Sequence, residues 1–308
     1  MLNFLFGFDD NYQIQGSVAI YSLLENVKDK INIFVIIDSS SANFNFPDVI
    51  TSHKNLNKLT LKMIDLSDNF YNIEQAHVSK ATFYRLYLSS LFENENENFI
   101  YLDADIICVQ DPKKSLSSAI QKMEINNYSV AFADELYRNQ YEEPFIRLGM
   151  VSNKYFNAGV MIVNLKKWNE DAYSTKAINL VEALKEKAKF WDQDVLNALF
   201  DGNYLSLDTN LNYRTAGLKK RNNIDKKIFI HFSGKSKPWD AGGIFEEFAQ
   251  LYHGYYRRLY GDEFHVTIKN RKNAIIKLYR YRKHFKSLPY MTLTVSYTHL
   301  TLPTKRIV

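Results

Sequence analysis

The first half of the chain alternates short apolar runs with stretches whose apolar residues recur at helical spacing. The runs 3–8 and 31–37 have the length and composition of strands buried on both faces. Between them, five apolar residues fall mostly on one helical face: Val18, Ile20, Leu23, Leu24 and Val27. Further runs at 59–66 and 99–102 predict strands, and 79–91 predicts a helix between them. Strands joined by helical crossovers predict an α/β fold, with an open, mostly parallel sheet and helices on both faces.

The second half of the chain follows this pattern less regularly. Residues 129–133, 159–163 and 228–232 predict strands, whereas 192–200 and 244–260 predict helices. No internal repeat is visible at the periods typical of solenoid proteins. We therefore expect a single α/β domain rather than an array of repeats.

Two aspartates, Asp103 and Asp105, come directly after the predicted strand 99–102. Ligands of open parallel sheets bind outside the carboxyl ends of the strands. Side chains two residues apart on a strand point the same way, and two converging carboxylates repel each other unless a cation lies between them. Oxygen ligands of this kind suit Mg²⁺ or Mn²⁺. A solvated turn is the alternative interpretation of an Asp-x-Asp pair taken alone.

A second polar segment, residues 231–239, begins in the last two residues of the predicted strand 228–232 and reads HFSGKSKPW. A neutral His231 imidazole could complete the ligand set of the metal. Gly234 would let the backbone approach a phosphate closely, and Lys237 would bring a positive charge to it. The alternative is a histidine at a strand end followed by an ordinary basic loop.

A third segment, Gly7 to Tyr12, lies at the end of the first predicted strand. The short polar side chains of Asp9 and Asn11 could bind a base or a ribose there. The glycine-rich G-x-G-x-x-G fingerprint of dinucleotide-binding proteins is absent, which argues against a nicotinamide dehydrogenase. Helix capping by aspartate or asparagine explains the same residues equally well.

A fourth candidate is split between two places in the sequence. Asn157 precedes the apolar run 159–163, and Asp192 and Gln193 open the predicted helix 192–200. The amides of Asn157 and Gln193 could orient a sugar through hydrogen bonds without carrying charge. Carboxylates at a helix start are also ordinary capping residues, so this pair decides nothing by itself.

Composition narrows the class of protein. A composition of 46% hydrophobic and 24% charged residues is that of a globular protein, and it excludes intrinsic disorder, collagen-like sequence and coiled coil. The single cysteine, Cys108, cannot form an internal disulfide, which favours a reducing cytosol. No apolar run approaches the roughly 20 residues that span a bilayer. The N-terminal residues lack a basic segment, so they predict a buried strand rather than a signal peptide.

Charge is distributed unevenly along the chain. Residues 264–286 hold eight Lys and Arg and no acid, whereas residues 1–263 hold 29 bases against 34 acids. An acidic body is not the footprint of a protein that clamps nucleic acid, so we expect no nucleic-acid partner. The basic segment interleaves its cations with aromatic and aliphatic residues, which suits an anionic membrane surface. A solvated helix and a nucleic-acid contact are its alternatives.

Six segments, taken in order, resemble the family-eight retaining glycosyltransferases, and most closely the bacterial enzymes that add galactose or glucose to lipopolysaccharide. The segments are FGFDDNY at 6–12, KATFYRL at 80–86, YLDAD at 101–105, YFNAGVMIVNLKKW at 155–168, DQDVLN at 192–197 and HFSGKSKPW at 231–239. The resemblance covers residues 1–260. It implies one Rossmann-like nucleotide-diphospho-sugar transferase domain of the GT-A type over 1–262. A basic aromatic tail over 263–290 would follow, and we expect 296–308 to be a non-native read-through that does not pack.

The resemblance also implies roles for single residues. Mn²⁺ or Mg²⁺ would be held by Asp103, Asp105 and His231, bridging the diphosphate of a UDP-sugar. Contacts to the nucleotide and its diphosphate would come from eight residues: Gly7, Asp9, Asn11, Tyr12, Arg85, Ala104, Gly234 and Lys237. The transferred sugar would be surrounded by Asn157, Asp192, Gln193 and Asp134.

The implied activity is transfer of a hexose, galactose or glucose, from a UDP-sugar to a glycan or lipid-linked saccharide of lipopolysaccharide or another cell-surface polysaccharide. The resemblance also implies that an amide, Gln193 in this chain, lies where a double displacement needs a carboxylate nucleophile, which favours attack by the acceptor on the leaving-group side. We expect a cytoplasmic protein, bound peripherally to the inner face of the membrane through its tail.

Two alternatives to a transferase stay open from the sequence. A non-catalytic module that binds sugar nucleotides or glycans would share Asp103 and Asp105. A phosphatase that uses Asp-x-Asp as nucleophile and acid usually continues with Gly-Thr, whereas Ile106 and Ile107 follow here.

Overall fold

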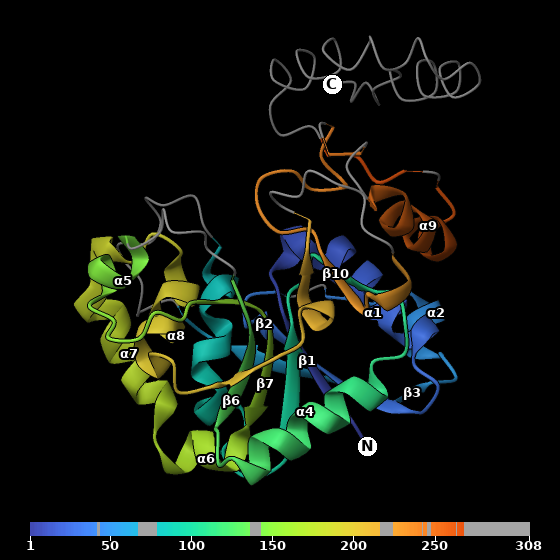
Figure 1. The fold of residues 1–308 in the computed structure, drawn as a ribbon. Coiled ribbons are helices and arrows are strands. Elements are labelled where there is room, and N and C mark those ends of the chain that lie inside the picture. Colours follow the sequence, from blue (N-terminus) through green and yellow to red (C-terminus); the bar gives the residue numbers. More distant parts are fainter. Residues whose placement is uncertain are drawn as a thin grey trace.

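A seven-stranded sheet forms the centre of the molecule, and a three-stranded sheet stands above one end of its strands (Figure 1). The computed structural model describes residues 1–41, 44–66, 79–135, 143–215, 224–241, 243–244, 248–262 and 264–267. The large sheet has the order β3-β2-β1-β4-β7-β6-β8, and the small one the order β5-β10-β9. The single α/β architecture expected from the sequence is confirmed.

The strands are β1 Asn3–Gly7, β2 Ile31–Asp38, β3 Leu56–Ile64, β4 Asn98–Leu102, β5 Ile106–Cys108, β6 Val130–Asp134, β7 Phe156–Asn164, β8 Leu205–Ser206, β9 Tyr213–Arg214 and β10 Phe229–His231. The α-helices are α1 Gln13–Asn26, α2 Asp48–Thr51, α3 Leu88–Leu91, α4 Lys113–Ile125, α5 Glu143–Leu148, α6 Leu165–Glu170, α7 Tyr173–Leu184, α8 Trp191–Phe200 and α9 Ala249–Tyr260. Short 3₁₀ helices are η1 Asp10–Tyr12, η3 Lys80–Tyr87, η4 Lys185–Lys187, η5 Thr209–Asn212 and η6 Ile224–Lys226.

Strand direction confirms a mostly parallel sheet with one reversed strand. Strands β3, β2, β1 and β4 pair in parallel, and β8 pairs in parallel with β6. Strand β7 runs antiparallel to both of its neighbours, β4 and β6. The carboxyl ends of β1, β2, β4 and β6 therefore lie along one edge of the sheet, which is where ligands of such sheets bind.

Two hydrophobic cores cover the two faces of the sheet. Along β1, Phe4 and Phe6 join one core and Leu5 joins the other, as expected for a strand buried on both sides. Helices α1, α4 and α9 contribute to the first core, and α3, α6, α7 and α8 to the second (Figure 1). This double burial explains why the apolar runs of the sequence locate the strands well.

Two predicted helices differ from the observed ones. Residues 79–91 form the 3₁₀ helix η3 followed by the short α3, because packing decides the shape of a segment that is buried on nearly all sides. The helix predicted over 244–260 is observed as α9, beginning at Ala249 after Phe248 in a left-handed conformation. Residues 245–247 lie outside the described part of the chain.

The expectations for the C-terminal region fall almost wholly outside the described residues. Of the basic tail 263–290, the structure describes only 264–267, where Thr267 N–H donates to Trp239 O over 2.6 Å. The segment 296–308 lies outside it entirely. Among the helices that the structure describes, none has the length and apolarity to cross a membrane. Membrane-surface binding by the tail stays a prediction.

Candidate functional site

The Asp-x-Asp pair lies in a tight turn at the carboxyl end of β4. Asp103 N–H donates to Gly159 O of β7 over 2.9 Å, and Ile106 N–H donates to Asp103 O over 3.1 Å, which closes the turn. The two aspartates are thus not on a strand as the sequence argument assumed. The turn, rather than strand alternation, makes their side chains converge.

His231 reaches this turn through the small sheet. The chain leaves the turn as β5, which pairs antiparallel with β10 and places His231 opposite Ile106. Phe232 N–H then donates to Asp105 O over 3.0 Å. Backbone hydrogen bonds therefore join the end of β10 to the Asp-x-Asp turn, and the fold sets the position of His231 relative to the two aspartates.

The side chains of Asp103, Asp105 and His231 fit a divalent cation. One ligand atom from each lies within 4.8 Å of the others. His231 Nε2 is 3.3 Å from Asp105 Oδ1 and 4.0 Å from Asp103 Oδ2. Asp105 Oδ1 is buried and has no hydrogen-bond partner among the described residues. A buried carboxylate oxygen without a partner is costly, and two carboxylates with an imidazole suit Mn²⁺ or Mg²⁺.

Two cations flank this ligand set. The buried Arg85 guanidinium lies 2.6 Å from Asp103 Oδ1 through Nη2 and 2.8 Å from Asp192 Oδ2 through Nε. Lys237 pairs with Asp105 Oδ2 and donates to Phe232 O over 2.7 Å. Burial alone would raise the pKa of Asp105, but Lys237 and His231 together hold that pKa below its usual range. Asp105 is therefore ionised, as a metal ligand must be.

The amides predicted to surround a sugar lie next to each other. Gln193 Oε1 accepts from Asn157 Nδ2 over 2.9 Å and from the Ala158 N–H over 3.2 Å. Gln193 Nε2 donates to Tyr155 OH over 3.2 Å. Asp192 is buried beside Arg85, and burial raises the pKa of Asp192 to about 7 against the lowering effect of that guanidinium. Through Arg85 the amides and the metal-ligand turn form one site.

The residues predicted to hold the nucleotide are placed less uniformly. Asp9 caps η1 by accepting from the Tyr12 N–H over 3.2 Å, and it also accepts from Ser79 Oγ, so the capping interpretation is realised. Tyr12 packs edge-on against Trp239 with ring centroids 6.0 Å apart. Burial, and after it the nearby Asp105 carboxylate, raises the pKa of Tyr12, which places this ring beside the site. Asn11 is exposed in the same turn.

Gly7 is buried at the end of β1, Ala104 is buried inside the Asp-x-Asp turn, and Gly234 has a positive φ of 84° in the polar loop after β10. Their contacts to a nucleotide stay predictions. Asp134 at the end of β6 accepts a hydrogen bond from Tyr204 OH. Among the described contacts, none joins Asp134 to the metal-ligand turn or to Gln193.

Three functional candidates were missed by sequence reasoning. Glu135 lies 3.4 Å from Asn157 Nδ2 and forms an ion pair of 2.6 Å with Arg214 Nη1. Asn212 lies between Asn157 and His231, bonded to both. Period-two alternation from Phe132 places Glu135 on the opposite face from Asp134, so this signal was present in the sequence. Asn212 ends the short helix η5 and Arg214 lies in the two-residue strand β9, elements too short to give a sequence pattern.

Gly159 lets the imidazole approach the sheet. A Cβ atom on Gly159 would lie 2.3 Å from His231 Cε1 and 2.7 Å from His231 Nδ1, far inside van der Waals contact. His231 is itself buried and hydrogen-bonded, so it has no room to move aside. Glycine in the YFNAGV segment is therefore required for close packing of the histidine against β7.

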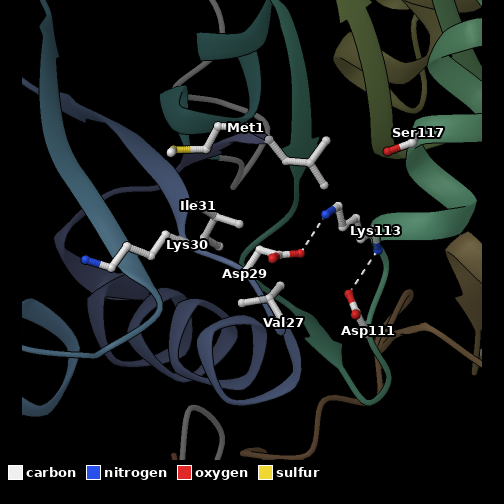
Figure 2. Close-up of a pocket in the computed structure, with 9 residues that line it drawn as sticks. Met1, Val27, Asp29, Lys30, Ile31, Asp111, Lys113 and Ser117 are labelled. Carbon is white, nitrogen blue, oxygen red and sulfur yellow. Dashed lines mark hydrogen bonds and ion pairs between the residues drawn. The ribbon is translucent and has the colours of Figure 1, made fainter.

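A separate pocket of about 150 Å³ lies at the amino ends of β1 and β2, at the opposite edge of the sheet (Figure 2). Its walls include Val27 and Ile31, together with the ion pair of Lys113 Nζ and Asp29 Oδ2 at 2.7 Å. Both charged side chains are more than half exposed, so solvent screens the pair. Asp103, Asp105 and His231 lie at the other edge of the sheet, apart from this pocket.

Comparison with known proteins decides the family. The sequence profile of glycosyl transferase family 8 matches residues 3–243, a range that includes Asp103, Asp105, His231 and Gln193. The chain belongs to glycosyl transferase family 8. The resemblance seen in the six sequence segments is thereby confirmed, and this family 8 protein is a glycosyltransferase.

Curated relatives and solved structures agree with this membership. A lipopolysaccharide 1,2-glucosyltransferase of Escherichia coli is 27% identical over 305 residues, covering 94% of this chain and 86% of the relative. A lipopolysaccharide 1,3-galactosyltransferase of Salmonella typhimurium is 26% identical over 258 residues, covering 79% and 74%. The galactosyltransferase LgtC, solved with donor and acceptor sugar analogs, has a TM-score of 0.67 at 20% identity, covering 89% of this chain and 100% of LgtC. The last comparison confirms the GT-A type of fold.

Proposed function

We propose that this family 8 glycosyltransferase moves galactose or glucose from a UDP-sugar to a glycan acceptor of lipopolysaccharide or another cell-surface polysaccharide, with retention at the anomeric carbon. The observation that carries the proposal is the ligand set of Asp103, Asp105 and His231 at the carboxyl edge of the sheet, in which the buried Asp105 Oδ1 accepts no hydrogen bond from the described residues. The Escherichia coli relative is a lipopolysaccharide glucosyltransferase and the Salmonella relative a lipopolysaccharide galactosyltransferase, which supports the sugar and the acceptor class.

The contacts of Lys237 and Arg85, the two cations next to the ligand set, indicate what each residue would do. A divalent cation, when bound by the three ligands, would supply charge that offsets the negative charge developing on the leaving diphosphate. Lys237 holds one oxygen of Asp105 and lies in the loop that would face that diphosphate. Arg85 holds Asp103 on one side and Asp192 on the other, so it fixes the metal-ligand turn relative to the sugar-binding amides.

The carboxylates near Gln193 are unsuited to act as a nucleophile. Asp192 pairs with Arg85, Glu135 with Arg214, and Asp194 with Arg147 Nη1 at 2.7 Å. Each is buried and each is held by a guanidinium, which lowers its nucleophilicity and fixes its direction. The amide of Gln193 is itself a weak nucleophile. This arrangement supports attack by the acceptor on the leaving-group side, with the departing phosphate accepting the proton of the acceptor hydroxyl.

Replacement of Gln193 by alanine tests that mechanism. The loss of its orienting hydrogen bonds is expected to lower turnover by about tenfold to a hundredfold, since orientation but no covalent step is lost. Intact-protein mass spectrometry of the wild type during turnover should show no hexosyl adduct. Gln110→Ala, in a loop outside the site, serves as the matched control. A hexosyl group found on Gln193 would contradict the mechanism.

A panel of sugar nucleotides tests the activity itself. Incubation with Mn²⁺ and UDP-galactose, UDP-glucose or UDP-N-acetylglucosamine is expected to release UDP slowly from one of the first two donors, because water replaces the missing acceptor. Chelation of the metal should abolish that release. Liberation of inorganic phosphate would instead indicate a phosphatase. Tight binding of a donor without any turnover would indicate a binding module.

A further inference from the structure

A chain of buried side-chain hydrogen bonds connects Gln193 with His231 through two asparagines. Asn157 Nδ2 donates to Gln193 Oε1 over 2.9 Å, and Asn212 Nδ2 donates to Asn157 Oδ1 over 2.8 Å. Asn212 Oδ1 lies 2.9 Å from His231 Nδ1. Asn157, Asn212 and His231 are all buried. The chain therefore runs through the interior from the sugar-binding amide to the third metal ligand.

Two backbone amides fix the direction of every bond in this chain. The Ala158 N–H donates to Gln193 Oε1 over 3.2 Å, and the Gly159 N–H donates to Asn157 Oδ1 over 3.1 Å. Because a backbone N–H only donates, both of these side-chain atoms must be oxygens. Asn157 consequently turns its amino group toward Gln193, which is also the direction of the Glu135 carboxylate. The usual ambiguity of amide orientation is thereby removed.

The same logic fixes the state of the imidazole. Since Asn157 Oδ1 is an acceptor, Asn212 must present its amino group to it and its oxygen to His231. That oxygen can only accept, so His231 Nδ1 carries a proton, and in the neutral imidazole Nε2 is then the nitrogen that holds the lone pair. Nε2 lies 3.3 Å from Asp105 Oδ1, the buried oxygen without a hydrogen-bond partner among the described residues. With the ring neutral, a lone pair of Nε2 and a carboxylate oxygen face each other at this distance, an arrangement that a divalent cation between them stabilises.

We propose that Asn212 is a positioning residue that sets the tautomer of His231, leaving Nε2 free for a divalent cation, and that links this ligand to Gln193 through Asn157. The inference rests on the proposed function for its metal, but the tautomer is a property of the metal-free protein. Gly159 contributes by leaving room for the imidazole against β7. Partners behind a metal ligand typically change metal affinity by about tenfold to a hundredfold when removed.

Nitrogen NMR of the metal-free protein tests the tautomer directly. In the neutral form of the ring, the proton of His231 should lie on Nδ1. The resonance is assigned by its loss in His231→Gln. In Asn212→Ala the preference for Nδ1 should weaken. A neutral His231 ring that carries its proton on Nε2 in the wild type would overturn the inference, whatever the metal does.

Titration calorimetry with MnCl₂ tests the consequence for the metal. Asn212→Ala is expected to bind Mn²⁺ about tenfold to a hundredfold more weakly than the wild type. Asn212→Asp keeps an oxygen for the Nδ1 proton and removes the donor to Asn157. It should therefore bind Mn²⁺ within about threefold of the wild type, as a carboxylate behind a histidine ligand does, while its turnover falls. Asn210→Ala, in the same 3₁₀ helix, is the matched control and should behave as the wild type.

The outcomes separate the inference from the proposed function. A wild type that binds no Mn²⁺ would overturn the proposed metal. A wild type that binds Mn²⁺, together with an Asn212→Ala variant of equal affinity and unchanged melting temperature, would overturn the positioning role. Equal weakening in Asn212→Ala and Asn210→Ala would also overturn it, because the loss would then be that of the helix rather than of one hydrogen bond.

Discussion

Asp105→Asn is expected to lower turnover by about a thousandfold, the largest effect of any single change in this site. Asp105 is the only described carboxylate that contacts both His231 Nε2 and Lys237. The substitution replaces a charged ligand oxygen with an uncharged amide beside His231 Nε2 and Lys237 Nζ. Both the affinity for the metal and the charge balance near the diphosphate are therefore lost. UDP release with saturating donor, and Mn²⁺ affinity by calorimetry, measure the two effects.

Asp111→Asn is a suitable control for that experiment. Asp111 follows β5 on the same stretch of chain, and its carboxylate accepts from the Lys113 N–H over 3.1 Å at the opposite edge of the sheet. The control should retain the turnover and metal affinity of the wild type. A folded Asp105→Asn variant with turnover close to that of the wild type would remove the basis of the proposed chemistry.

Arg85→Met is expected to cost about 3 to 5 kcal/mol of folding free energy, because it leaves buried carboxylates without their cation. Arg85 bridges Asp103 and Asp192, and its guanidinium carbon also lies 4.2 Å from the centre of the Tyr101 ring. Methionine fills similar space but supplies no charge. Urea denaturation followed by circular dichroism measures the loss. The double variant Arg85→Met/Asp192→Asn should regain part of it, since one of the unpaired charges is then removed.

The pH dependence of that variant has a definite sign. Burial already raises the pKa of Asp192 to about 7 in the intact protein, above the value of an unfolded chain. Without Arg85 the folded pKa must rise further, so the folded state holds a proton that the unfolded state releases. Stability of Arg85→Met should therefore increase as the pH falls from about 8 to 5. A loss of stability in Arg85→Met that stays the same across this range would contradict the role given to the ion pair.

The inner strands of the large sheet were predictable from sequence because they are buried on both faces, whereas the short edge strand β8 is partly exposed and was not predicted. In β1, consecutive residues Phe4 and Leu5 belong to opposite cores, so each position must be apolar and the run stands out. The segments around Asp103, Asp105 and His231 were predictable for a related reason, since each lies at the end of a buried strand. When a strand can be predicted from its apolar run, the polar residues at its end can be recognised as candidate site residues.

The geometry that joins these residues was not predictable. Ala158 and Val160 of β7 are two residues apart, yet they join opposite cores, because the pairing of β6 with β7 shifts register there. That irregularity lies at Gly159, where the imidazole packs. Asn212 comes from the 3₁₀ helix η5, which has no apolar period, and its position depends on contacts with chain more than 50 residues away in β7.

Glu135 shows the opposite case, in which the information was present in the sequence and was missed, whereas the sugar contact of its neighbour Asp134 stays a prediction. Asp134 follows a predicted strand and carries the expected charge, and alternation from Phe132 turns it toward Tyr204. Glu135 faces Asn157 and Arg214 instead. A strand with side-chain period two assigns adjacent residues to opposite faces, so these two neighbouring carboxylates meet different partners.

The most direct measurement is anomalous X-ray diffraction from crystals grown with MnCl₂ and UDP. The account predicts one manganese peak bound by the carboxylates of Asp103 and Asp105 and by Nε2 of His231, with the UDP diphosphate as a further ligand. A manganese peak that none of these three side chains touches, or one bound by His231 through Nδ1, would contradict it.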